Sequence, residues 1–127
     1  MLGQVSAIIA SIILIGLMVF QFMLILGRPL GRYAWGGQHK VLPTKLRVGS
    51  VVAILIYILS IVILLDESGV TSVISNSFLN QYGIWVLCIY FLIGVPLNTL
   101  SRSKPERNVM TPVVATLCAL TFIVALV

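Results

Sequence analysis

Long uncharged segments recur four times along the chain. Residues 5–26 form the longest of these apolar runs, and similar runs cover residues 48–65, 83–100 and 109–127. A helix needs about 20 apolar residues to cross a hydrocarbon layer of about 30 Å. The runs lack the strict apolar–polar alternation of a membrane barrel strand. The pattern therefore predicts an all-α, integral membrane four-helix bundle that forms a single domain over residues 1–127.

The first and third runs differ from the other two in their flanks and in their polar residues. MLGQ precedes the first run without any Lys or Arg, and the run is longer than the apolar core of a secretory signal, so we expect it to be a membrane span. The third run is weaker, because Pro96 and Asn98 interrupt its far end.

Basic residues occur only in two of the three connections. The connection after the first run and the connection after the third run hold all eight: Arg28, Arg32, Lys40, Lys45 and Arg47, then Arg102, Lys104 and Arg107. The remaining connection, residues 66–82, has no basic residue. Short loops rich in Lys and Arg stay in the cytosol. The distribution predicts an N-out, C-out topology with both basic loops on the cytosolic side.

Composition agrees with a membrane protein. The chain is 60% hydrophobic and 9% charged, with a mean hydropathy of +1.16, whereas soluble domains are about 25% charged. The net charge of +5 could suggest nucleic acid, but no recognition motif accompanies it. Charges beside a membrane attract anionic lipid by about 1 kcal/mol each. We therefore expect anionic membrane lipids as partners and no nucleic acid.

Metal and cofactor chemistry has little support in the sequence. Cys88 and Cys118 fall inside apolar runs and are interpreted as small packing residues. The chain has one histidine, His39, and neither a CxxC nor an HExxH motif. No metal and no cofactor are predicted.

The polar residues within the apolar runs decide which classes of transporter or channel the chain can resemble. An exporter of the small multidrug resistance type needs a carboxylate in its first helix, where this chain has only Gln4 and Gln21. The Asn-rich and Phe/Thr-rich motifs of the fluoride-channel type are also missing. A passive pore in a dimer stays open as an interpretation. Its polar path would use Tyr57, Ser60, Tyr90 and Thr121, for which helix-to-helix hydrogen bonds are the commoner role.

Small residues recur every four positions in three of the runs. They are Gly3, Ala7 and Ser11, then Gly49 and Ala53, then Thr111, Ala115 and Ala119. Small residues let helix backbones approach closely in lipid. We interpret them as packing positions inside one bundle, with a homodimer face as the alternative.

The segment GRPLGRYAWGGQHKVLPTKLR is the first candidate functional feature. Gly27 and Pro29 are expected to end the first helix, and Tyr33 and Trp35 suit the headgroup layer. Gly36-Gly37 favours a tight turn or a backbone cradle for an anion. The interpretations left open are an aromatic-anchored interfacial loop, a phosphate or headgroup site, and catalysis by His39.

The segment PLNTLSRSKPER is the second candidate functional feature. Pro96 frees a carbonyl one turn earlier, and the polar side chains after it can restore that hydrogen bond or face a ligand. Glu106 is interpreted either as the partner of a basic residue such as Arg102 or as a general base working with His39. Both loops close the same face of a small bundle, which predicts a shared binding site formed by Arg28, Arg32, Trp35, Gln38, His39, Asn98, Ser101, Arg102 and Arg107.

The outer connection, residues 66–82, is interpreted as a surface lid without chemistry. Its apolar residues could form a short interfacial helix, and Asp66-Glu67 could bind a cation weakly.

The strings RPLGRYAWGGQHKVLPTKLRVGS and LNTLSRSKPERNVMTPV resemble a family of small bacterial four-helix membrane proteins. That family shows an AWGGQH-type loop after helix one and an N-x-x-S-R-S-x-x-E-R segment after helix three. The resemblance covers most of the chain and implies a multi-pass protein of the bacterial plasma membrane. It carries over no established activity.

The sequence thus favours a non-enzymatic binding or accessory protein. Its two basic cytosolic loops would hold an anionic lipid headgroup, a phosphate-bearing ligand or a membrane partner. A small dimeric transporter or channel is the alternative, and an enzyme acting on a lipid headgroup, with His39 and Glu106 as acid and base, is the third hypothesis.

Overall fold

Four long helices make up most of the molecule. The computed structural model describes residues 1–74 and 76–127. The helices are α1 (Leu2–Ile25), α2 (Thr44–Glu67), α3 (Ser77–Thr99) and α4 (Lys104–Leu126), and two short 3-10 turns, η1 (Gly31–Tyr33) and η2 (Trp35–Gly37), follow α1. Each of the four long helices is long and apolar enough to cross a membrane. The predicted all-α fold of a multi-pass membrane protein is confirmed.

The helices extend beyond the apolar runs, most of all at the starts of α2, α3 and α4. Hydropathy marks only the part of a helix that lipid can cover, while the backbone hydrogen bonds continue through polar residues. Asn76 caps α3, because its side chain accepts a hydrogen bond of 3.0 Å from the Leu79 N–H. Pro105 occupies the first turn of α4, where no intrahelical donor is needed. Lys45, Arg47, Lys104 and Arg107, predicted in loops, therefore lie in first helical turns.

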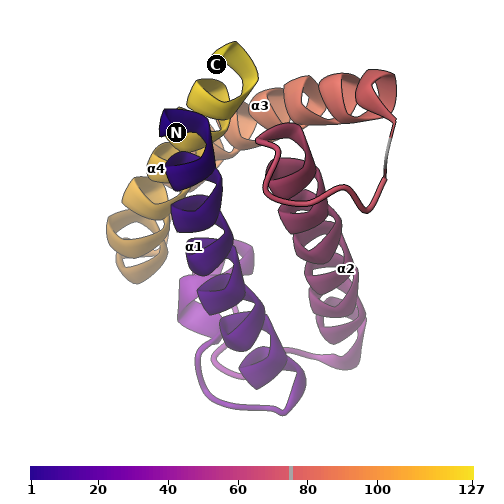
Figure 1. Ribbon diagram of the computed structural model, residues 1–127. Coiled ribbons are helices and arrows are strands. Elements are labelled where there is room, and N and C mark those ends of the chain that lie inside the picture. Colours follow the sequence, from indigo (N-terminus) through magenta and orange to yellow (C-terminus); the bar gives the residue numbers. More distant parts are fainter. Residues whose placement is uncertain (75) are drawn as a thin grey trace.

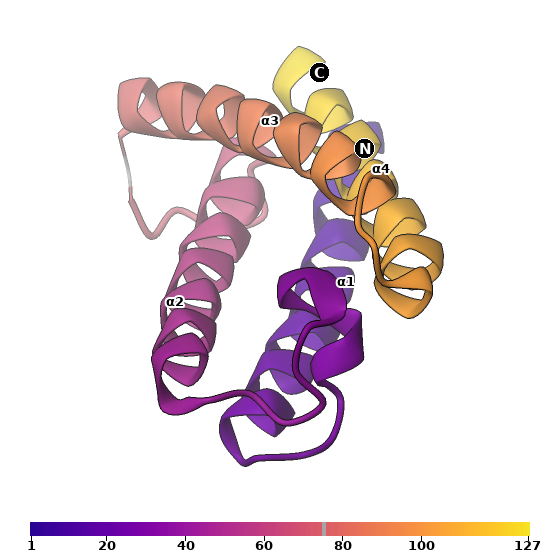
Figure 2. The same ribbon diagram turned by 180° about the vertical axis from the view of Figure 1, so that it is seen from behind.

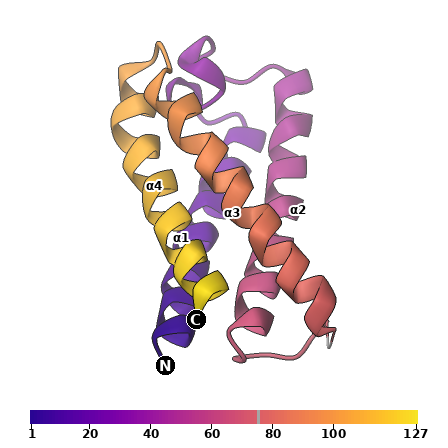
Figure 3. The ribbon, with the colours of Figure 1, turned by 90° about the horizontal axis from the view of Figure 1, so that it is seen from above.

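Consecutive helices run up and down through the bundle. Figure 3 shows both termini and the α2–α3 connection at one end, and the α1–α2 and α3–α4 connections at the other. The two termini are adjacent, since a Cβ added to Gly3 would lie 3.6 Å from Cγ1 of Val127. We call the end with the α1–α2 and α3–α4 connections the basic end, because all eight basic residues lie in or next to those connections.

The packing around the bundle is uneven. α1 packs along α2 and α4, and α3 packs along α4, but α2 and α3 share little contact. They meet near their connection, where a Cβ on Gly83 would come within 2.9 Å of Cδ1 of Ile63. From there α3 runs diagonally towards α4 (Figure 3), and Figure 1 shows how steeply it crosses the direction of α2. The two helices therefore separate towards the basic end.

The core is formed by apolar side chains from all four helices. Leu14, Leu64, Ile84 and Leu117 are fully buried, one from each helix. The small-residue positions of α1, Gly3, Ala7 and Ser11, are also buried, as expected for packing within the bundle. The small residues Ala115 and Ala119 of α4 are exposed, so they do not pack within the bundle as predicted.

The outer connection is shorter than predicted and is organised by Asp66. Its carboxylate accepts hydrogen bonds from the backbone N–H groups of Val73 at 3.0 Å and Ile74 at 2.6 Å, and from the hydroxyl of Thr71. Both carboxylate oxygens are thus used to shape the loop. The predicted interfacial helix is not formed by residues 70–74, and Phe78 and Leu79 belong to the first turn of α3.

Candidate functional site

The connection between α1 and α2, residues 26–43, folds into a closed loop that we call the capping loop. Gly27 leaves α1 in a left-handed conformation with φ +86°. The N–H of Gly31 donates a hydrogen bond of 2.9 Å to the carbonyl of Lys40. A Cβ on Gly31 would come within 2.9 Å of the His39 carbonyl carbon, so the first and last segments of the loop are in contact. Figure 2 shows the loop folding back along α1 before it reaches α2.

The capping loop is joined directly to the start of α4. The N–H of Gly36 donates a hydrogen bond of 2.9 Å to Oε2 of Glu106. The hydroxyl of Ser103 donates to the carbonyl of Arg32. Gly37 packs against the same serine, because a Cβ there would lie 2.6 Å from the Ser103 Oγ. The two basic connections thus form one continuous surface, although they are far apart in the sequence.

Trp35 joins the capping loop to α2. Its indole ring lies on Gly49, where an added Cβ would meet ring carbon Cζ2 at 2.8 Å. Trp35 holds this position with a φ of +53°, which is unusual for a bulky residue. Nearby, Nε of Arg47 donates a hydrogen bond of 2.8 Å to the carbonyl of Leu42, whose side chain is buried. The capping loop is therefore held to α2 as well as to α4.

Glu106 is the most unusual charged residue of this region, because its side chain is only 8% exposed. Its partners are the Gly36 N–H and the hydroxyl of Ser101. The predicted salt bridge to Arg102 or to the other basic loop is not among the contacts of Glu106 with the described residues. Its place in the first turn of α4 is also favourable, since helix N-termini stabilise negative charge.

Two adjoining cavities lie beneath the capping loop. The smaller, which we call the polar cavity, has a volume of about 170 Å³ and is lined by Leu17, Phe20, Gln21, Tyr33, Ala34, Trp35, Tyr57, Asn98, Glu106, Met110 and Val114. The larger, the lateral cavity, has a volume of about 380 Å³ and is lined by Leu17, Trp35, Tyr57, Tyr90, Phe91, Ile93, Gly94, Leu97, Asn98, Val114 and Leu117. The lateral cavity occupies the space where α2 and α3 separate.

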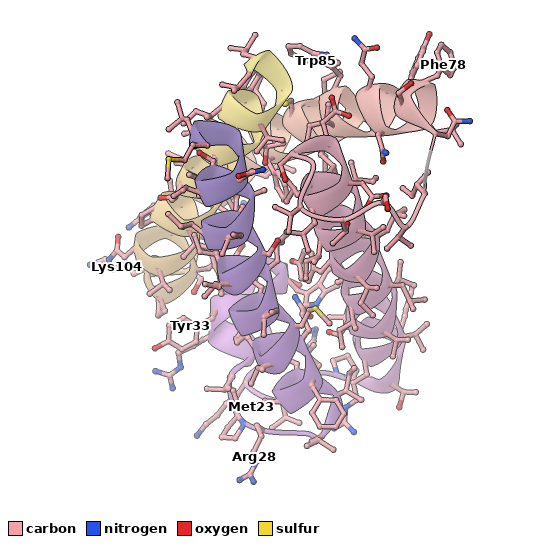
Figure 4. All side chains as sticks on the ribbon, viewed as in Figure 1. Met23, Arg28, Tyr33, Phe78, Trp85 and Lys104 are labelled. Atoms are coloured by element: carbon pink, nitrogen blue, oxygen red, sulfur yellow. The ribbon has the colours of Figure 1, made fainter. Side chains whose placement is uncertain are left out.

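The predicted site residues divide into two groups. Trp35 and Asn98 line both cavities. The other seven lie outside them: Arg28, Arg32, Gln38, His39 and Arg102 are exposed, Arg107 is half-buried, and Ser101 is buried beside Glu106. Figure 4 shows Arg28 at the end opposite Phe78 and Trp85, and Lys104 pointing outwards at the side of the molecule. The structure therefore brings the predicted residues to one end without gathering them around one cavity.

Gln21, Tyr57 and Glu106 line the polar cavity but were not among the nine residues of the predicted binding site. Tyr57 was expected along a possible polar path, and Glu106 as a salt-bridge partner or general base. Gln21 is one of two glutamines in the first apolar run and its flank, and a polar side chain in a span is the signal that could have indicated it. Gln21 and Glu106 line the same polar cavity only because α4 packs on α1, and the sequence does not show this packing.

Comparison with known proteins adds no further assignment. No protein-family model, no curated protein and no solved structure matches the chain. Among the residues described, no group of three or more His, Cys, Asp or Glu side chains is placed to hold a metal ion. Fold and composition define the class, a multi-pass helical membrane protein, and the proposals below rest on its own geometry.

Proposed function

We propose that the protein is a non-enzymatic binding or accessory protein of the bacterial plasma membrane. Its basic end lies in the cytosol and binds an anionic lipid headgroup, a phosphate-bearing ligand or an acidic segment of a membrane partner. The observation that carries the proposal is the direct bonding of the two basic connections. Gly36 and Glu106, which hold them together, are 70 positions apart in the sequence.

The distribution of charge supports this proposal. Six of the basic side chains are exposed at or near this surface: Arg28, Arg32, Lys40, Lys45, Arg102 and Lys104. The only acidic residue of the basic end, Glu106, is turned inwards and buried. Asp66 and Glu67 lie at the far end of α2. The positive charge of the basic end is therefore left without acidic neighbours on its surface, and anions are attracted to it.

Lipid retention tests the proposal. Native mass spectrometry of the protein released from phosphatidylglycerol nanodiscs should show bound lipid. Arg32→Gln and Arg102→Gln should each lower retention about fivefold, because each cation contributes about 1 kcal/mol at a membrane surface. Arg32→Lys keeps the charge and serves as the matched control, with retention close to that of the unchanged protein.

The proposal fails if no anionic lipid is retained, or if the double variant Arg32→Gln/Arg102→Gln retains as much as the unchanged protein. Equal loss in Arg32→Lys and Arg32→Gln would also contradict it, because the effect would then not follow charge.

The transport and enzyme alternatives have weaker support. Tyr57 and Tyr90, expected along a polar path, do line the lateral cavity. Ser60, however, is buried and donates a hydrogen bond of 2.7 Å to the carbonyl of Ile56 on its own helix. For the enzyme alternative, Glu106 lines the polar cavity whereas the exposed His39 lies outside both cavities. Binding is therefore the function that the geometry supports best.

A further inference from the structure

The polar cavity presents hydrogen-bond acceptors and a negative charge. Glu106 contributes a carboxylate, and Gln21, only 9% exposed, has an Oε1 atom without a hydrogen-bond partner among the described residues. One side-chain N–H of Asn98 donates to the carbonyl of Gly94 at 2.8 Å, which leaves the amide oxygen and the second N–H for a ligand. Unsatisfied buried acceptors and buried charges are costly unless they are paired.

The lining of this cavity carries no opposite charge. No Lys, Arg or His is among the described residues that surround it. The wall also contains four aromatic residues: Phe20, Tyr33, Trp35 and Tyr57. Aromatic rings attract cations placed over their faces, and a carboxylate beside them strengthens the preference for a positive ligand.

The lateral cavity continues the polar cavity with apolar walls. Five residues line both: Leu17, Trp35, Tyr57, Asn98 and Val114. On α3 the lining residues Tyr90, Ile93 and Leu97 are 45%, 54% and 67% exposed, so this cavity is open towards the outside of the bundle. Its volume of about 380 Å³ is within the usual range for small-molecule sites, about 300–1,000 Å³.

We propose that the two cavities together form a binding site for an amphipathic primary amine in its ammonium form. The ammonium group occupies the polar cavity, where its N–H groups donate to Glu106, Gln21 and Asn98. The apolar part of the molecule lies in the lateral cavity and enters from the membrane between α2 and α3. The site is separate from the basic surface, whose ligands carry the opposite charge.

Amine binding tests the proposal in the chain with all four helices. The protein is placed in nanodiscs of phosphatidylcholine, a lipid without a primary amine, and n-octylammonium binding is measured against empty nanodiscs. Octanol, octanoate and n-octyltrimethylammonium are the matched probes. We expect n-octylammonium to bind at least about tenfold more tightly than the other three, because only it combines a positive charge with N–H donors.

Glu106→Gln should weaken n-octylammonium binding about tenfold or more, since it removes the charge that pairs with the ligand. Glu67→Gln, which removes a carboxylate at the opposite end, is the control and should bind like the unchanged protein. Val114→Phe fills the wall shared by both cavities and should also reduce binding. It provides a second variant if Glu106→Gln does not fold, and thermal unfolding of each variant checks this.

The source of the amine is decided by repeating the measurement with lipid. Selective retention of phosphatidylethanolamine over phosphatidylcholine, lost in Glu106→Gln, supports a lipid headgroup as the ligand. Binding of n-octylammonium without such retention supports a free amine. Octanol binding as tightly as n-octylammonium, or Glu106→Gln and Val114→Phe both folding and binding normally, would overturn the proposal. These results are independent of the Arg32 and Arg102 variants, so the two proposals fail separately.

Discussion

Gly36 and Gly37 are neighbours with nearly the same left-handed backbone, at φ +75° and +71°, yet their surroundings differ. No atom lies within 4 Å of a Cβ added to Gly36, whereas a Cβ on Gly37 would press on Ser103. Gly36→Ala should therefore cost about 1–2 kcal/mol, the usual penalty of a left-handed L-residue. Gly37→Ala adds a steric clash at the contact with α4.

We expect Gly37→Ala to destabilise the protein by about 3 kcal/mol or more. Thermal unfolding in detergent compares the two variants, and Gly36→Ala is the matched control for the backbone penalty. Equal destabilisation by both would show that the contact between Gly37 and Ser103 is not formed.

The residues of the capping loop were only partly predictable. The Gly-Gly pair indicates a turn, and Tyr33 and Trp35 indicate an interfacial position. The burial of Glu106 was not predictable, because its partner Gly36 is a backbone N–H and leaves no pattern in the sequence. Glutamate beside several arginines favours a salt bridge on charge alone, and the fold supplied different donors.

At the scale of elements, Gly49 is the point where α2 receives the indole ring of Trp35. Gly49→Leu should push this ring out of its place and loosen the capping loop. In a Trp85→Phe background, Trp35 is the remaining tryptophan of the two in the chain. Its fluorescence should then shift to longer wavelength and become easier to quench from water.

Gly16→Leu is the control for this change. Gly16 is also a helical glycine, but nothing lies within 4 Å of its Cβ position, so the new side chain meets no neighbour. Unchanged Trp35 fluorescence in Gly49→Leu would contradict the described contact.

The helices themselves were predictable because lipid imposes a strong requirement for apolar length. Their ends were not, since the N-cap Asn76 of α3 and Pro105 in the first turn of α4 lie outside the apolar runs. The separation of α2 from α3, and with it the lateral cavity, was beyond the sequence as well. It depends on the crossing angle of α3, which small differences in packing determine.

For the molecule as a whole, the adjacency of the two termini gives a direct test of the helix arrangement. A Cβ on Gly3 would lie 3.7 Å from the Cβ of Val127, within the range of about 3.5–4.5 Å found in disulfides. With Cys88 and Cys118 replaced by Ala, Gly3→Cys/Val127→Cys should form an intramolecular disulfide under mild oxidation. Non-reducing electrophoresis and mass spectrometry detect it.

Gly16→Cys/Val127→Cys is the matched control and should remain reduced, because Gly16 lies further along α1, with no neighbour within 4 Å of its Cβ position. Failure of the Gly3 and Val127 pair to cross-link would reject the packing of α1 against the end of α4.

The bonds between the capping loop and α4 also have a consequence for biosynthesis. Gly36 reaches its partner only after 70 further residues have been added, and the carbonyl of Arg32 meets Ser103 after 71. At about 5–20 residues per second, these 70 positions take roughly 4–14 s to translate. During this interval α1 and α2 leave the ribosome with a capping loop that still lacks its bonds to α4. Insertion of the second helical hairpin is therefore the event that completes the first, and a chain truncated before Glu106 would keep that loop open to proteases.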